Sequence, residues 1–222
     1  MMQVLLAIFR HPQLSQLLAF KGGTSLMMFY NLSRFSTDLD FNLLDASKME
    51  YVYNELHNLL LKFGTIDDEA MKFYGPILVL NYGKGERMLK VEVSSREYPN
   101  HYEVRSLLGT DIRVMTLSDM FAHKLCALGE RITPRDIYDV WFFLQNRTEI
   151  NAEIVQLRTG MSVSEYAQQC AAKVRSYSSR ILMQGLGEVL LDNQSKNFAR
   201  QQLIPETASA LELFALCPLI AE

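Results

Sequence analysis

The sequence is poor in cysteine, proline and tryptophan, and it lacks a long apolar run. Its 222 residues include three cysteines, six prolines and one tryptophan. Cys126, Cys170 and Cys217 are odd in number and far apart, so they predict neither a disulfide framework nor a zinc site and favour a reducing cytoplasm. No apolar run reaches the roughly 20 residues that a membrane helix needs, so we expect no membrane partner. We interpret residues 1–12 as a first helix, because a signal peptide would have a basic region and a small-residue cleavage site.

The sequence also lacks an excess of positive charge. Its formal net charge is -3, which excludes the general electrostatic footprint of a nucleic-acid-binding protein but not a local basic surface. The four histidines are scattered, and no Walker A or G-x-S-x-G motif occurs. Common zinc, P-loop and serine-hydrolase sites are therefore not predicted.

Apolar patterning divides the chain near residue 115. Before this point, short runs predict strands at residues 69–74, 77–82, 88–95, 101–108 and 111–116, with a tight hairpin at residues 83–86. Ser47 and Glu50 fit a capping box that begins a helix. Beyond this point the spacing predicts helices, the first within residues 117–131 with Gly129 as its stop and the next beginning at Thr133 and Pro134. We predict a mixed α/β (α+β) core over residues 1–115 and a helical domain over residues 116–222.

A glycine motif lies between a predicted strand and a predicted helix. Lys21, Gly22, Gly23, Thr24 and Ser25 follow the short strand and precede an apolar helix. Glycines let the backbone approach a ligand, and the free N–H groups of a helix start favour phosphate. Thr24 or Ser25 can add a hydroxyl donor. A flexible turn before an ordinary helix explains the same residues without a ligand.

A pair of carboxylates follows on the next predicted strand, residues 34–44. Asp38 and Asp40 are two residues apart and therefore share one face of that strand. They repel each other and are costly to bury unless a cation neutralises them. Oxygen ligands of this kind suit Mg²⁺ bound together with phosphates. Glu92, in the alternating run 88–95, is a candidate third acid of a two-metal site, although a solvated strand face explains it as well.

The combined motif over about residues 20–43, FKGGTSL…YNLSRFSTDLDF, resembles the AbiEii/AbiGii toxin family. This family is part of the nucleotidyltransferase superfamily typified by DNA polymerase β. The long gap between Gly-Thr and the first aspartate favours the AbiEii branch over antibiotic-modifying relatives. Residues 119–128 resemble the lysine-bearing helix of the family, and residues 135–140 resemble its Arg-Asp-x-x-Asp motif. The last 75 or so residues carry no motif that we can place.

The resemblance implies a nucleotidyltransferase core, a helical C-terminal domain and a set of site residues. Lys124 would stabilise charge on a triphosphate, and Asp136 would orient nucleotide or acceptor, with Asp139 the weaker candidate of its motif. A lysine at the edge of the apolar stripe can also extend to solvent, and Asp136 can simply cap its helix with Thr133. The residues implied in catalysis are Asp38, Asp40, Lys124, Asp136 and Glu92; those implied in nucleotide binding are Lys21, Gly22, Gly23, Thr24, Ser25, Arg34 and Ser36; those implied in metal binding are Asp38, Asp40 and Glu92.

The resemblance also implies a function. We expect Mg²⁺-dependent transfer of a nucleotide from a nucleoside triphosphate to an acceptor such as the 3′ end of tRNA, by the toxin of a toxin–antitoxin or abortive-infection system. The expected partners are the triphosphate, tRNA and a cognate antitoxin, whose direct contact stays open, and the expected state is a cytoplasmic monomer. Candidate basic residues for tRNA are Arg131, Arg135, Lys173, Arg175 and Arg180.

Two alternatives stay open from the sequence. The same scaffold can modify a protein or a small molecule, which the overall acidity favours. A non-catalytic nucleotide-binding module is the other alternative, and the retained Asp38–Asp40 pair together with Lys124 argues against it.

Overall fold

The computed structural model describes residues 1–83 and 85–221, which form two compact units. The sheet unit consists of Met1–Asn31, Ser36–Glu97 and Tyr102–Met115. The helical unit consists of Leu32–Phe35, Tyr98–His101 and Thr116–Glu222. All residues after position 115 therefore belong to the helical unit. Two short segments of the first half, 32–35 and 98–101, belong to the helical unit.

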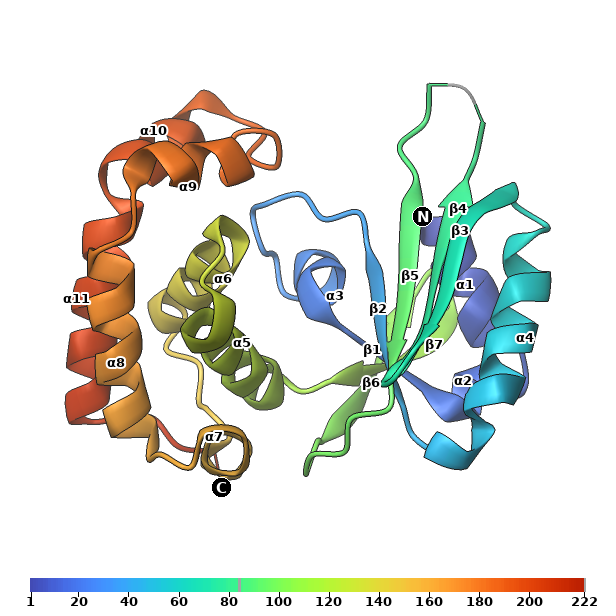
Figure 1. Ribbon diagram of the computed structural model, residues 1–222, viewed down its shortest axis with the longest axis horizontal. Coiled ribbons are helices and arrows are strands. Elements are labelled where there is room, and N and C mark those ends of the chain that lie inside the picture. The colour runs from blue at the N-terminus through green and yellow to red at the C-terminus, as the bar shows by residue number, and fades with distance from the viewer. Residues whose placement is uncertain (84, 222) are drawn as a thin grey trace. The chain divides into compact units, whose positions relative to one another are not determined.

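A mixed sheet forms the centre of the sheet unit (Figure 1). Within the described residues it has seven strands in the order β3-β4-β5-β2-β1-β7-β6. The pairs β2–β5 and β1–β7 are parallel, and the other neighbours are antiparallel. The predicted mixed α/β fold is therefore confirmed. The strands are β1 (Leu18–Lys21), β2 (Leu39–Leu43), β3 (Thr65–Lys72), β4 (Gly75–Asn81), β5 (Leu89–Ser94), β6 (Tyr102–Leu107) and β7 (Thr110–Met115). The hairpin predicted at residues 83–86 joins β4 to β5, and its Lys84 lies outside the described residues.

Helices cover both faces of this sheet. Helices α1 (Met2–Arg10), α2 (Leu14–Leu17) and α4 (Met49–Leu60) lie on one face, and α3 (Gly22–Phe29) lies on the other (Figure 1). Phe41 of β2 packs against Phe9 of α1 and Phe20 of β1, with ring centroids 6.1 and 5.5 Å apart. All three side chains are buried, so their transfer from water stabilises the contact between α1 and the sheet.

The start of α4 differs from its prediction. The Asp45 carboxylate accepts hydrogen bonds from the backbone N–H of Ser47 at 3.0 Å and from its hydroxyl at 2.6 Å. A 3₁₀ turn, η1 (Ala46–Lys48), therefore precedes α4, and no side chain caps α4 itself. The predicted capping box of Ser47 and Glu50 is wrong, because Ser47 is hydrogen-bonded to the Asp45 carboxylate instead.

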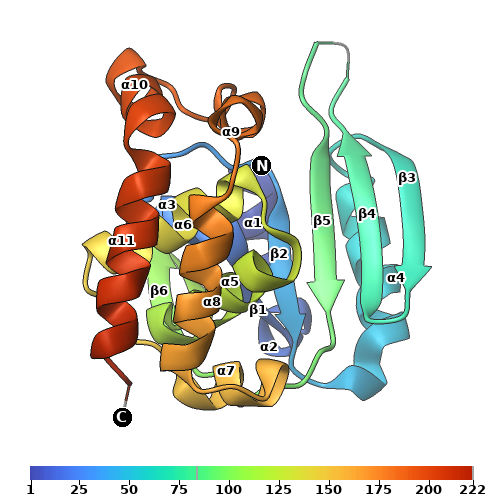
Figure 2. The same ribbon diagram turned by 60° about the vertical axis from the view of Figure 1, so that its left-hand side comes forward.

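The helical unit contains helices α5 to α11. Figure 2 shows α8 and α11 side by side in front of α5 and α6, and α11 packs against both α8 and α6. In the described part of the chain, we find no helix that combines the length and the apolar character needed to cross a membrane. The bounds are α5 (Leu117–Arg131), α6 (Pro134–Gln145), α7 (Ala152–Thr159), α8 (Val163–Arg175), α9 (Ser179–Leu186), α10 (Asn193–Gln201) and α11 (Leu203–Leu216).

Gly129 does not end α5, contrary to the prediction. The helix continues to Arg131, and a Cβ at position 129 would overlap the Tyr166 ring of α8. The Tyr166 hydroxyl donates a hydrogen bond to the carbonyl of Cys126 at 3.0 Å. The glycine is therefore needed for close packing of α8 on α5, and not for helix termination.

Candidate functional site

The start of α3 and the Asp40 carboxylate lie against each other in the sheet unit. Strand β1 ends at Lys21 and α3 begins directly at Gly22, whose φ of +81° favours glycine. A Cβ at Gly22 would overlap the Oδ2 atom of Asp40. The glycine therefore lets a carboxylate approach the backbone at the N-terminus of a helix, where N–H groups are available to an anion.

The hydroxyls of the glycine motif point into the protein. Thr24 and Ser25 are fully buried. The Thr24 hydroxyl donates a hydrogen bond to the backbone carbonyl of Asp38. The Ser25 hydroxyl is buried without a hydrogen-bond partner among the described residues. Through its hydrogen bond, Thr24 ties α3 to the segment that carries Asp38.

Three carboxylates lie near the start of β2 and the neighbouring strand β5. The strand begins at Leu39, so Asp38 directly precedes it and does not lie within it as predicted. Asp40 is the register partner of Lys21 on β1 and of Glu92 on β5. Asp38, Asp40 and Glu92 are all half-buried. Asp40 and Glu92 therefore sit side by side on neighbouring strands.

The carboxylate oxygens of Asp38, Asp40 and Glu92 are ligands that a hard divalent cation prefers. Carboxylate oxygens suit Mg²⁺, which is commonly held by one or two carboxylates together with the phosphates of a substrate. Across residues 1–83 and 85–221, no set of three or more His, Cys, Asp or Glu side chains is arranged to hold a metal ion by itself. The carboxylates fit such an ion in donor chemistry, with phosphate oxygens needed to complete the coordination.

Two lysines lie among these groups. Lys21 Nζ donates to Asn42 Oδ1 at 2.9 Å, and Asn42 Nδ2 donates to the Tyr102 hydroxyl at 3.0 Å. Lys90 Nζ lies 2.8 Å from Glu92 Oε2. Burial acts to lower the pKa of Lys90, but the hydrogen bond to Glu92 and the charges of the three carboxylates raise it overall. The three carboxylates therefore favour the charged form of Lys90.

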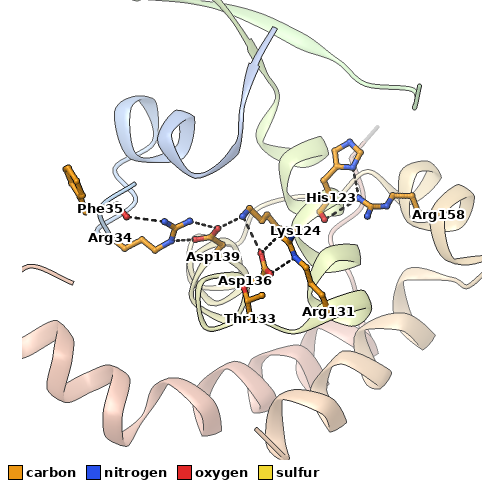
Figure 3. A network of polar contacts seen from close by, with 9 residues as sticks. All are labelled: Arg34, Phe35, His123, Lys124, Arg131, Thr133, Asp136, Asp139 and Arg158. Carbon is orange, nitrogen blue, oxygen red and sulfur yellow. Dashed lines mark hydrogen bonds and ion pairs between the residues drawn. The ribbon is translucent and has the colours of Figure 1, made fainter. Parts of the chain in front are cut away.

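The helical unit holds a second cluster, which Figure 3 shows in detail. Arg34 Nε and Nη2 donate to the two carboxylate oxygens of Asp139 at 2.6 and 2.7 Å. Lys124 Nζ lies 2.7 Å from Asp139 Oδ2 and 3.4 Å from Asp136 Oδ1. Arg34, Asp136 and Asp139 are at most 3% exposed. Arg34 therefore makes a buried bidentate ion pair with Asp139.

Opposite charges control ionisation in this second cluster. Burial acts to raise the pKa of the Asp139 carboxyl, but the charges of Arg34 and Lys124 and their hydrogen bonds lower it overall. The pKa of the Arg34 guanidinium is raised, because Asp139 outweighs the opposing effect of burial. Both members of the pair are therefore ionised in the folded protein at neutral pH.

Asp136 also supports the cap of its own helix, which is Thr133. Its backbone N–H donates to the Thr133 hydroxyl oxygen at 3.2 Å, and the Thr133 hydroxyl donates to Asp136 Oδ2 at 2.6 Å. Arg131 Nε donates to the same carboxylate at 3.1 Å. The predicted helix start at Thr133 and Pro134 is confirmed. The Asp136 carboxylate thus holds the hydroxyl of the cap residue, and not the Thr133 backbone N–H as in the capping box that the sequence offered as an alternative.

Asp139, the weaker candidate of its motif from the sequence alone, makes the shortest ion pairs of this cluster. The signal for it was the Arg-Asp-x-x-Asp spacing, because residues three apart share one face of a helix. Its partner Arg34 is 105 positions away in the sequence, which no local pattern indicates. Ser36, also expected near a nucleotide, is only 7% exposed.

Several of the basic residues proposed for tRNA have other partners. The Lys173 ammonium donates to the carbonyl of Gly129, and Arg175 pairs with Glu212 at 2.6 Å. Arg131 pairs with Asp136, as described above. These three cations thus have structural roles within the helical unit. Arg135 and Arg180 are exposed.

The lowered pKa of Asp139 predicts a pH-dependent contribution to stability. A carboxyl with a lower pKa in the folded state stabilises the fold fully above its unfolded pKa of about 4. This contribution is lost as the pH falls through the lower folded pKa. We expect the gap in unfolding free energy between the wild type and Asp139→Asn, measured by urea titration, to narrow between pH 6 and pH 3. A gap that stays constant over this range would contradict the ion pair.

Gly22→Ala tests the contact between α3 and Asp40. The added Cβ must displace the Asp40 carboxylate and adopt a positive φ, which costs roughly 1–2 kcal/mol by itself. We expect a soluble, folded variant whose activity at this site is at least tenfold lower. Gly160→Ala is the matched control, since Gly160 has a φ of +71° and open space around it. Equal activities of the two variants would show that Asp40 needs no such approach.

Comparisons with known proteins agree with this fold. The family model described as nucleotidyl transferase AbiEii toxin, type IV toxin–antitoxin system, matches residues 3–214. No curated protein is significantly similar to the chain.

Solved structures of bacterial proteins share its architecture. A putative nucleotidyltransferase from Helicobacter pylori has 22% identity and a TM-score of 0.56, covering 96% of this chain and 88% of its own. MenT4, the nucleotidyltransferase toxin Rv2826c of Mycobacterium tuberculosis H37Rv, has 18% identity and a TM-score of 0.53, covering 99% and 91%. JHP933 from Helicobacter pylori has 22% identity and a TM-score of 0.53, covering 96% and 86%. At these identities the likeness shows a common fold over nearly the whole of each chain.

Proposed function

Since the chain belongs to the AbiEii family of nucleotidyltransferase toxins of type IV toxin–antitoxin systems, we propose that it transfers a nucleotide to the 3′ end of tRNA with the help of Mg²⁺. The observation that carries this proposal is the approach of the Asp40 carboxylate to the start of α3 at Gly22. A helix N-terminus and a carboxylate at one place are suited to the phosphates of a nucleotide and to a cation that bridges them.

The carboxylate group is the proposed metal site. Asp38, Asp40 and Glu92 would hold Mg²⁺, which when bound neutralises charge that develops on the phosphates. Backbone N–H groups from Gly22 onward would bind the β- and γ-phosphates, with Lys21 at the end of β1 beside them. Glu92 would accept the proton of the acceptor hydroxyl.

The proposed reaction is an in-line displacement. The acceptor oxygen forms a bond to the α-phosphorus, and the bond from that phosphorus to the bridging oxygen of the β-phosphate breaks. Pyrophosphate leaves with the electron pair of the broken bond. The toxic effect would follow from modification of the acceptor end, and a cognate antitoxin would counter it.

The second cluster would contribute as the resemblance implies for Lys124 and Asp136, but not for Arg34. Lys124, the least buried member of its ion pairs with an 18% exposed side chain, is the proposed stabiliser of triphosphate charge. Asp136 would orient nucleotide or acceptor as the resemblance implies, in addition to supporting the cap of its helix. We assign Arg34 a positioning role, because its guanidinium is bound to Asp139 and to the carbonyl of Phe35 at 3.2 Å. Arg34 and Asp38 are four positions apart along the chain.

Label transfer tests the acceptor. The protein is incubated with Mg²⁺, total tRNA and each α-labelled nucleoside triphosphate in turn, with Asp38→Ala as the control. We expect label on tRNA from one nucleotide and none with the variant. Nucleotide binding without labelled tRNA would overturn the tRNA acceptor and support a protein or small-molecule acceptor, which the net charge of -3 favours.

A further inference from the structure

Lys90 and Glu92 share one face of β5. They are two residues apart on the strand, while Val91 and Val93 between and beyond them are buried on the opposite face. Lys90 Nζ donates to Glu92 Oε2 at 2.8 Å, and both side chains are somewhat more than a third exposed. The ammonium therefore occupies one oxygen of a carboxylate of the proposed metal site.

The ammonium also lies in the field of the other two acids. Asp40 is the register partner of Glu92 on the adjacent parallel strand. The charges of Asp40 and Asp38 both act on the Lys90 ammonium. Lys90 thus contacts Glu92 and lies in the field of the other two carboxylates that would coordinate a divalent cation.

We propose that Lys90 is a built-in competitor for the divalent cation, so that the carboxylates bind metal weakly by themselves and tightly only with a triphosphate. This inference rests on the proposed function. A bound cation and the ammonium both require Glu92, and positive charges a few ångströms apart repel each other. Triphosphate oxygens give the displaced ammonium a new anionic partner. Lys90 thereby couples metal binding to nucleotide binding.

Metal affinity without nucleotide tests the competition directly. Mn²⁺ serves as the probe, because the electron paramagnetic resonance signal of the free ion reports the bound fraction without any turnover. Lys90→Met removes the competing charge, and we expect it to bind Mn²⁺ about tenfold tighter than the wild type. Lys90→Arg keeps the charge and should show no gain. Lys72→Met on β3, where the side chain is exposed, removes the same charge at another place and is the matched control.

The remaining arms separate this inference from the proposed metal site. Asp40→Asn should abolish Mn²⁺ binding in either background. Equal affinities of wild type and Lys90→Met, with binding lost in Asp40→Asn, would overturn the competition and leave the metal site standing. An increase in Mn²⁺ affinity as large in Lys72→Met as in Lys90→Met would also overturn the competition, because it would show a general effect of net charge. Absence of binding in every variant would overturn both the competition and the metal site. Lys90→Gln replaces Lys90→Met if thermal unfolding shows that the methionine variant is not folded.

Discussion

Asp40→Asn is expected to slow nucleotide transfer by about 10²–10³-fold, the loss typical of removing one group that stabilises transition-state charge. Asp40 combines three features: contact with the glycine turn at the start of α3, register pairing with Glu92, and oxygen donors that suit a divalent cation. The amide has nearly the same size, so the packing against Gly22 should persist. The rate of label incorporation from an α-labelled triphosphate measures the effect.

A matched control shows whether the loss of any acidic side chain from the sheet lowers the activity. Asp111→Asn on β7 removes an exposed carboxylate from the same sheet, and its activity should equal that of the wild type. If a folded Asp40→Asn variant retains more than half of the activity, Asp40 is not part of the site.

Asp139→Ala is expected to lower the free energy of unfolding by about 3–5 kcal/mol, because it leaves the Arg34 guanidinium buried without its carboxylate. Lys124 loses its shorter ion pair in the same variant. The double variant Arg34→Met/Asp139→Leu removes both buried charges and should be less destabilised than Asp139→Ala. Urea titration at pH 7 gives each value.

An exposed ion pair provides the reference for this experiment. Arg175 and Glu212 are 2.6 Å apart, and both side chains are more than half exposed. Arg175→Ala should therefore cost no more than about 1 kcal/mol. If Asp139→Ala costs as little as Arg175→Ala, the buried pair does not stabilise the helical unit as described.

Local patterns were sufficient to predict much of the fold. Alternation of apolar residues indicated the strands around Lys90 and Glu92, and Thr133 with Pro134 indicated the start of α6. These features depend on residues a few positions apart, where backbone geometry fixes which side chains share a face. The motif from Lys21 to Asp40 likewise indicated that a turn and a carboxylate belong together, and the strand register places Lys21 opposite Asp40.

Tertiary contacts decided what the sequence could not predict. Gly129 looked like a helix end but gives space to Tyr166, which lies on another helix. No local pattern indicated that the Thr24 hydroxyl donates to the carbonyl of Asp38. No local pattern indicated that Arg34 pairs with Asp139, which is 105 positions away. In each case a partner distant in the sequence sets the role of the residue.

The position of the label in the triphosphate tests the central claim, that this protein transfers a nucleotide and not a phosphate. The protein is incubated with Mg²⁺ and total RNA, and in parallel with a protein extract, using the same nucleoside triphosphate labelled either at the α- or at the γ-phosphate. We predict that the α-label becomes attached to the acceptor, that the γ-label is released as pyrophosphate, and that Asp40→Asn does neither. Transfer of the γ-label to the acceptor would contradict this account, because it would show attack at the terminal phosphate.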